Sequence, residues 1–142
     1  MAKSASERLK TKKGPKIVDM DKDFAGIRAG ERMLVGTPMM VNDYVSKIPT
    51  GEVRSIERLR NELARRHKCD KMCPVSTAIF VRIVAEAAIE EMDAGKQVDQ
   101  VAPFWRVIAP GDKIAKKLSI DPGWIAHQRT LETSIENPGP GD

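Results

Sequence analysis

The feature that most constrains this chain is a long apolar segment that begins at Pro74 and continues to about residue 93. Proline is favoured in the first turn of a helix, and the apolar residues that follow it recur at helical spacing. They lie on more than one side of the helix, which is typical of a largely buried helix. The segment therefore predicts a long, largely buried helix over about 75–93 in an α-rich domain.

Two shorter helices are predicted before it. Thr37 is an N-cap residue, Pro38 is a first helical residue, and Pro49 ends the helix that they begin. Ser55 is the next N-cap residue, and the apolar residues that follow it mark one face of a helix over 56–66. This helix and the long one, joined by a short polar connection, have the outline of a helix-turn-helix.

Charge is distributed unevenly over this helical pair. Residues 52–71 carry seven Lys or Arg and four Asp or Glu, a net charge of +3. Residues 86–99 carry five acids and one Lys, a net charge of −4. The dipole at the beginning of the long helix also favours an anion, so the basic end is predicted to face DNA phosphates. A solvated helical hairpin with ordinary surface charge is the alternative interpretation.

Length and composition predict how the rest of the chain is organised. A length of 142 residues fits one domain. Residues 1–16 carry six Lys or Arg against one Glu and predict a disordered basic arm. Glycines interrupt 17–36, which is predicted to be loosely ordered, and the folded domain is expected over 37–134. The Pro- and Gly-rich end, 135–142, is predicted to be a disordered tail.

The chain has the composition of a cytoplasmic protein. It contains no run of 18 apolar residues and no secretory h-region, so no membrane partner is expected. Cys69 and Cys73 cannot form a disulfide framework, which favours a reduced compartment. No cofactor is expected.

The segment after the long helix is rich in β-formers. Val101 to Ile108 predicts a strand, and Pro110-Gly111 predicts a turn after it. A final helix is expected over about 123–133. The chain is thus expected to be α+β, with more helix than strand.

Four segments resemble, in order, the C-terminal winged-helix domain of the alkylguanine-DNA alkyltransferases (methylated-DNA–protein cysteine methyltransferases). Residues 48–55, Ile-Pro-Thr-Gly-Glu-Val-Arg-Ser, are similar to the Ile/Val-Pro-x-Gly-Glu-Val turn of that family. The helical pair over 55–93 follows, then 102–108, Ala-Pro-Phe-Trp-Arg-Val-Ile, where the family has Pro-Cys-His-Arg-Val. A glycine and a helix over 123–132 complete the set. The resemblance implies a winged helix-turn-helix with a short β wing.

The sequence differs from the family pattern at several positions, and these differences change the function that the resemblance implies. Phe104 stands at the position of the reactive Cys and Trp105 at that of the His, so the thiolate that would accept an alkyl group is absent. Ile56 stands where the family has Tyr, and Glu132 lies close to an expected Glu. The chain is similar to the alkyltransferase-like proteins, which bind alkylated DNA without repairing it. This implies a non-enzymatic protein of DNA repair whose partners are double-stranded DNA and other repair proteins.

Several residues are candidates for the site. Phe104 and Trp105 either line a pocket for an extruded base or form the core, and Arg106 either contacts DNA or forms a salt bridge. Ser76, Thr77 and other residues of the long helix would enter a groove, while bases before it would contact phosphates. The predicted DNA-binding set is Arg54, Ser55, Lys68, Lys71, Ser76, Thr77, Arg82 and Arg106.

Two other functions stay open. Cys73, next to a helix N-terminus, or Cys69 could be the nucleophile of a true S-methyltransferase. The two cysteines with His67 also suggest a zinc site, although a structural site needs four ligands, and both thiols could simply be turn residues. The remaining alternative is a protein–protein interaction module on the same scaffold.

Overall fold

The computed structural model describes residues 4–11 and 13–136. About half of the chain is helical and three short strands form one sheet, so the predicted α+β class is confirmed. The helices are α1 (Ala5–Leu9), α2 (Pro38–Ser46), α3 (Ile56–Arg66), α4 (Pro74–Asp93) and α5 (Pro122–Glu136). The strands are β1 (Lys16–Asp19), β2 (Arg32–Val35) and β3 (Lys71–Met72), and the 3-10 helices are η1 (Val98–Gln100), η2 (Phe104–Arg106) and η3 (Ala115–Lys117).

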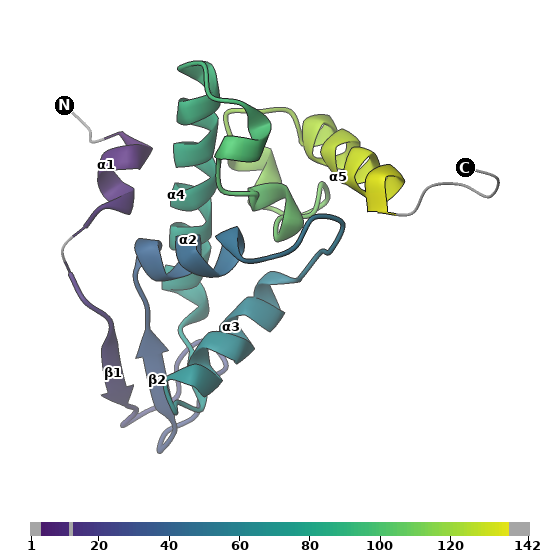
Figure 1. Cartoon of the computed structure of the whole chain (residues 1–142). Coiled ribbons are helices and arrows are strands. Elements are labelled where there is room, and N and C mark those ends of the chain that lie inside the picture. Colours follow the sequence, from purple (N-terminus) through teal and green to yellow (C-terminus); the bar gives the residue numbers. More distant parts are fainter. Residues whose placement is uncertain (1–3, 12, 137–142) are drawn as a thin grey trace.

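Helix α4 is long and has many buried residues, as predicted, and it lies at the centre of the fold. α1 and α2 pack against it, and η2 contacts it from the C-terminal part of the chain (Figure 1). Val81, Val84 and Ala88 of α4 belong to the main core, which is continuous with Leu59 and Leu63 of α3. No helix of the described residues is both long and apolar enough to cross a membrane.

The predicted helix starts are confirmed by their caps. The Thr37 hydroxyl accepts the backbone N–H of Met40 at 3.1 Å, and the Ser55 hydroxyl accepts that of Arg58 at 3.0 Å. Each cap satisfies one amide that the first turn of a helix leaves without an intrahelical partner. The last helix continues to Glu136, beyond its predicted end and into the predicted tail; residues 137–142 lie outside the described residues.

The N-terminal arm was predicted to be disordered, and for its described residues this is wrong. Leu9 of α1 is buried, and the Glu90 carboxylate of α4 accepts the backbone N–H groups of Ala5 and Ser6 at 2.9–3.5 Å. An acidic side chain 85 residues away thus caps a helix that is too short to be stable alone.

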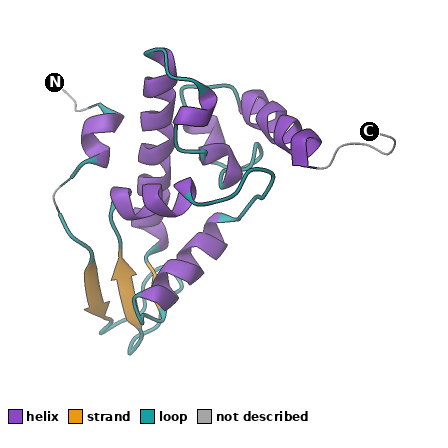
Figure 2. Cartoon of the chain, viewed as in Figure 1, coloured by secondary structure: helices purple, strands orange, loops and turns teal. Residues whose placement is uncertain are grey.

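The segment 17–36, predicted to be loosely ordered, contains two paired strands instead. β1 and β2 form an antiparallel hairpin, and β2 pairs in parallel with β3 (Figure 2). The hairpin closes between Phe24 and Ile27, where Ala25 and Gly26 have φ of +49° and +85°. Two consecutive positive φ angles are typical of the tight turns that suit strand twist, and Gly26 is the residue that favours them.

The predicted strand over 101–108 is wrong. The segment folds back on itself, with the amides of Val107 and Ile108 both donating to the Phe104 carbonyl at 3.1 and 2.9 Å. In a half-buried strand only every second side chain is buried. Here Phe104, Trp105, Val107 and Ile108 are all buried, which does not fit a strand of that kind. The described residues after α4 contain no strand, and the small sheet lies at the turn between α3 and α4.

Candidate functional site

Three segments that carry the family resemblance meet in space. The backbone N–H of Arg54, after the Gly-Glu-Val turn, donates to the carbonyl of Arg106 at 2.8 Å. Helix α5 also packs against η2. These contacts bring the 48–55 turn, η2 and α5 together in one place.

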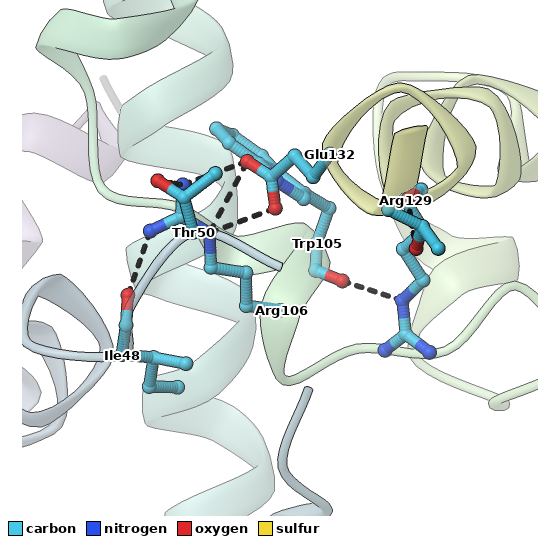
Figure 3. Close-up of polar contacts among 7 residues, drawn as sticks. Ile48, Thr50, Trp105, Arg106, Arg129 and Glu132 are labelled. Atoms are coloured by element: carbon cyan, nitrogen blue, oxygen red, sulfur yellow. Dashed lines mark hydrogen bonds and ion pairs between the residues drawn. The ribbon is translucent and has the colours of Figure 1, made fainter. Parts of the chain in front are cut away.

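Arg106 joins these three segments (Figure 3). Its Nη1 donates to the Ile48 carbonyl at 2.6 Å, and its Nη2 donates to the Thr50 hydroxyl at 3.0 Å. Nε and Nη2 form a bidentate ion pair with Glu132 of α5, the closest contact being 2.7 Å. The Arg106 side chain is 13% exposed, and its donors bond to groups within the protein. Of the two predicted roles, contact with DNA or a salt bridge, Arg106 therefore has the salt bridge.

Glu132 is ionised in this setting. Burial raises the pKa of its carboxyl, but hydrogen bonds from Arg106 and the Gly51 backbone lower it more, so that the pKa lies below its ordinary value. The Trp105 indole N–H lies beside the carboxylate and adds to this lowering, although it makes no hydrogen bond of normal geometry. A paired, deprotonated Glu132 holds the turn and α5 together and is not poised as an acid.

Phe104 and Trp105 do not line a base pocket. Phe104 is 0% and Trp105 is 1% exposed, and these two rings and that of Trp124 of α5 pack on one another at ring-centroid distances of 5.4–5.6 Å. The stacked and edge-to-face arrangement is that of a stable aromatic core. Of the two predicted roles, base pocket or core, these two side chains therefore have the second, because no face of either ring is left free to stack on an extruded base.

A cleft of about 430 Å³ lies beside this core, between the 53–57 turn and the 107–112 loop. Val53, Ile56 and Ala109 form apolar parts of its wall, and Val53 is 51% exposed. Arg129 and Asp112 contribute opposite charges. The Nε of Arg129 donates to the Trp105 carbonyl at 2.6 Å, and burial lowers the pKa of this guanidinium, which nevertheless stays protonated.

The structure divides the predicted DNA-binding set. Thr77 is fully buried and its hydroxyl donates to the Cys73 carbonyl at 2.6 Å, so it cannot reach DNA. The Arg54 guanidinium is 16% exposed and pairs with Glu52 at 2.5 Å, and the ammonium of Lys71 pairs with Glu31 at 3.4 Å. Ser76 is half-buried, and its hydroxyl oxygen is enclosed without a hydrogen-bond partner among the described residues.

Lys71 is 45% exposed despite its ion pair, and the other three members are also exposed. Lys68 is exposed at the C-terminal end of α3, and Ser55 is exposed at its N-terminal end. Arg82 is exposed on α4 and donates to the Lys117 carbonyl at 3.2 Å. The predicted groove-entering face of α4 is thus reduced to Arg82 and part of Ser76.

A basic face extends along α3 and onto the residue after its C-cap; of its members, Lys68 was in the predicted DNA-binding set, whereas Arg58 and Arg65 were counted only in the charge balance. Arg58, Arg65 and Lys68 are exposed along it, and neither Arg65 nor Lys68 pairs with an acid of the described residues. Arg58 and Arg65 are seven residues apart and therefore lie on one side of α3, and this spacing was the signal in the sequence. Lys68 follows the end of the helix, which is at Arg66. We call these three residues the α3 basic face.

The α3 basic face is anchored by a polar cluster underneath. Glu62 pairs with Arg58 at 2.8 Å and accepts a short hydrogen bond from the Tyr44 hydroxyl. That hydrogen bond and the one from Arg58 lower the pKa of Glu62, while burial and Glu62 raise the pKa of Tyr44. The guanidinium groups of Arg54 and Arg66 each lie 5.5 Å from the Tyr44 ring centroid, within cation–π distance.

The two thiols lie away from the cleft, after the opposite end of α3. Burial raises the pKa of Cys69, which disfavours the thiolate, and Cys73 is buried beside Ile27 and Met33. In the described part of the chain, no three His, Cys, Asp or Glu residues are placed to hold a metal ion together.

Comparison of the chain with protein-family models, with curated proteins and with solved structures found no match.

Proposed function

We propose that this chain is a non-enzymatic duplex-DNA-binding protein of the alkyltransferase-like type. In this proposal α3 and α4 are the helix-turn-helix of a winged-helix scaffold, with the small sheet at their turn. The α3 basic face contacts phosphates, and the cleft between the 53–57 turn and the 107–112 loop receives an extruded alkylated guanine.

The observation that carries the proposal is the position of the cleft. Its wall is built mainly from two of the segments that resemble the alkyltransferases and from the loop that follows the second, and Arg129 of a third segment also lines it. A volume of about 430 Å³ is within the range of small-molecule pockets. A guanine edge has both donors and acceptors, and Arg129 and Asp112 offer one partner for each.

The cleft is continuous with the α3 basic face, which supports a shared ligand. Ser55 and Glu57 line the cleft and also a shallower hollow that continues to Arg58 and Arg65. Phosphate contacts at Arg65 and Lys68 would position the duplex, whereas the cleft would select the base. The proposal therefore replaces most of the predicted α4 contacts with contacts from α3.

The test is fluorescence anisotropy with labelled duplexes that contain guanine or O-alkylguanine at one position. Ala109→Phe fills the cleft and should remove the preference for the modified duplex while leaving binding to the plain duplex. Ala94→Phe, exposed at the acidic end of α4, is the matched control. Equal affinity of the wild type for both duplexes would refute the base pocket.

Salt dependence tests the phosphate contacts. Log affinity should fall linearly with log salt, and the double variant Arg65→Gln/Lys68→Gln should reduce the slope by about 0.9 for each lost contact. No binding at low salt would instead support the protein–protein module.

Mass spectrometry after incubation with methylated DNA tests the transferase alternative, in which a methyl group appears on Cys69 or Cys73.

A further inference from the structure

A hollow lies between the N-terminal elements and the face of α4 that is remote from the proposed cleft. α1 packs on α4 and β1 pairs with β2 (Figure 1). The hollow has a volume of about 480 Å³ and is lined by described residues of α1, β1, β2, α2 and α4 and of the loops next to them. Nothing in the proposed DNA-binding function uses it.

The floor of the hollow is apolar. Ile79, Phe80 and Ile83 of α4 form one wall, and Val35 and Pro38 form the other. Ile79 is 48% exposed and Phe80 is half-buried, although both face a space that the N-terminal segment partly encloses. Apolar surface in such a space favours a ligand that brings an apolar group of its own.

The rim of the hollow is cationic. Arg8, Lys13 and Lys16 line it, and none of them pairs with an acid among the residues that the structure describes. Among the described residues that line the hollow, the one acid is Glu7, which accepts a hydrogen bond from the Ser4 hydroxyl at 3.3 Å. Three cations against one carboxylate leave an excess of positive charge directly beside an apolar floor.

We propose that this hollow binds one long-chain carboxylate. Its hydrocarbon tail lies against Ile79, Phe80 and Ile83, and its carboxylate lies at the rim, where Arg8 can pair with both oxygens. The volume is that of a small-ligand pocket. A DNA backbone would satisfy the rim but would bury nothing against the apolar floor, so the two features together favour an anionic amphiphile.

The experiment is isothermal titration calorimetry of the full chain with dodecanoate, dodecyltrimethylammonium and acetate. We expect saturable binding of one dodecanoate, with the cationic amphiphile at least about tenfold weaker, because charge-assisted bonds are lost. Acetate should not bind, because it lacks the tail. Equal binding of both amphiphiles would overturn the proposal, as would binding of an acidic apolar peptide without binding of dodecanoate.

Two variants locate the site. Ile79→Ser changes an exposed residue of the floor and Arg8→Gln removes a charge of the rim, and each should weaken dodecanoate binding about tenfold. Arg65→Gln on the α3 basic face is the matched control and should leave it unchanged. If Arg65→Gln weakens binding as much as Arg8→Gln, the ligand is held by general surface charge and the proposal is wrong.

Discussion

Helix α4 has two sides that are covered in different ways. One side meets η2, where Phe104 and Trp105 are fully buried and Arg106 is paired with Glu132 across two segments. The other side meets α1, a helix of five residues that leaves an open hollow and a half-exposed Ile79. The two sides of α4 therefore differ. On the η2 side the contacts are closed and supply stability, whereas on the α1 side apolar surface is left accessible to a ligand.

The largest expected effect is on the η2 side. Phe104→Ala should lower the free energy of unfolding by about 4 kcal/mol, because it removes a buried ring that packs on both Trp105 and Trp124. Urea denaturation measures this loss. A change below about 1 kcal/mol would mean that Phe104 is not in the core.

Breaking the ion pair should have the next largest effect. Glu132→Gln should cost about 3 kcal/mol at pH 7, because Arg106 loses its buried counter-ion. Glu91→Gln is the matched control, since it breaks an exposed pair with Lys96 that contributes about 1 kcal/mol or less.

The same pair predicts a pH dependence. Because its partners lower the pKa of Glu132 despite burial, the native state binds this proton less readily than the unfolded chain does. The stability from Glu132 is complete above its unfolded pKa of about 4.3 and is lost as pH falls below it. The difference in unfolding free energy between wild type and Glu132→Gln should therefore narrow in acid, and a constant difference would contradict the assignment.

On the α1 side, the expected effect is smaller and local. Leu9→Ala should cost about 2 kcal/mol at most, because α1 can detach while the rest of the domain stays folded. Hydrogen exchange should accelerate at the Ala5 and Ser6 amides, which Glu90 now holds, and stay slow in the middle of α4. Faster exchange throughout the chain would show that α1 is part of the global core.

The smallest effect is expected at Ile79. Ile79→Ser should change stability by no more than about 0.5 kcal/mol, because its side chain is already half exposed. Ile83→Ser, one turn along and 6% exposed, should cost about 3 kcal/mol. Equal losses in urea denaturation would remove the distinction between the exposed and the buried residues of the floor of the hollow.

The helices α2 to α5 were predictable because their signals are local. Thr37 and Ser55 cap their own first turns, and the apolar spacing over 75–93 belongs to one element. The candidate site was predictable only in outline. The segments over 48–55 and 102–108 were selected, but their meeting through Arg54 and Arg106 depends on contacts between distant parts of the chain.

By itself, the sequence determined where α2 to α5 lie, where charge accumulates and that position 104 is Phe and not Cys, because these properties need only neighbouring residues. Tertiary structure alone decided the rest. Burial of Phe104 and Thr77, the use of Arg106 in an ion pair and the order of α1 depend on surfaces that lie up to 85 residues away. A side chain's exposure is a property of what packs against it, and local sequence does not contain that information.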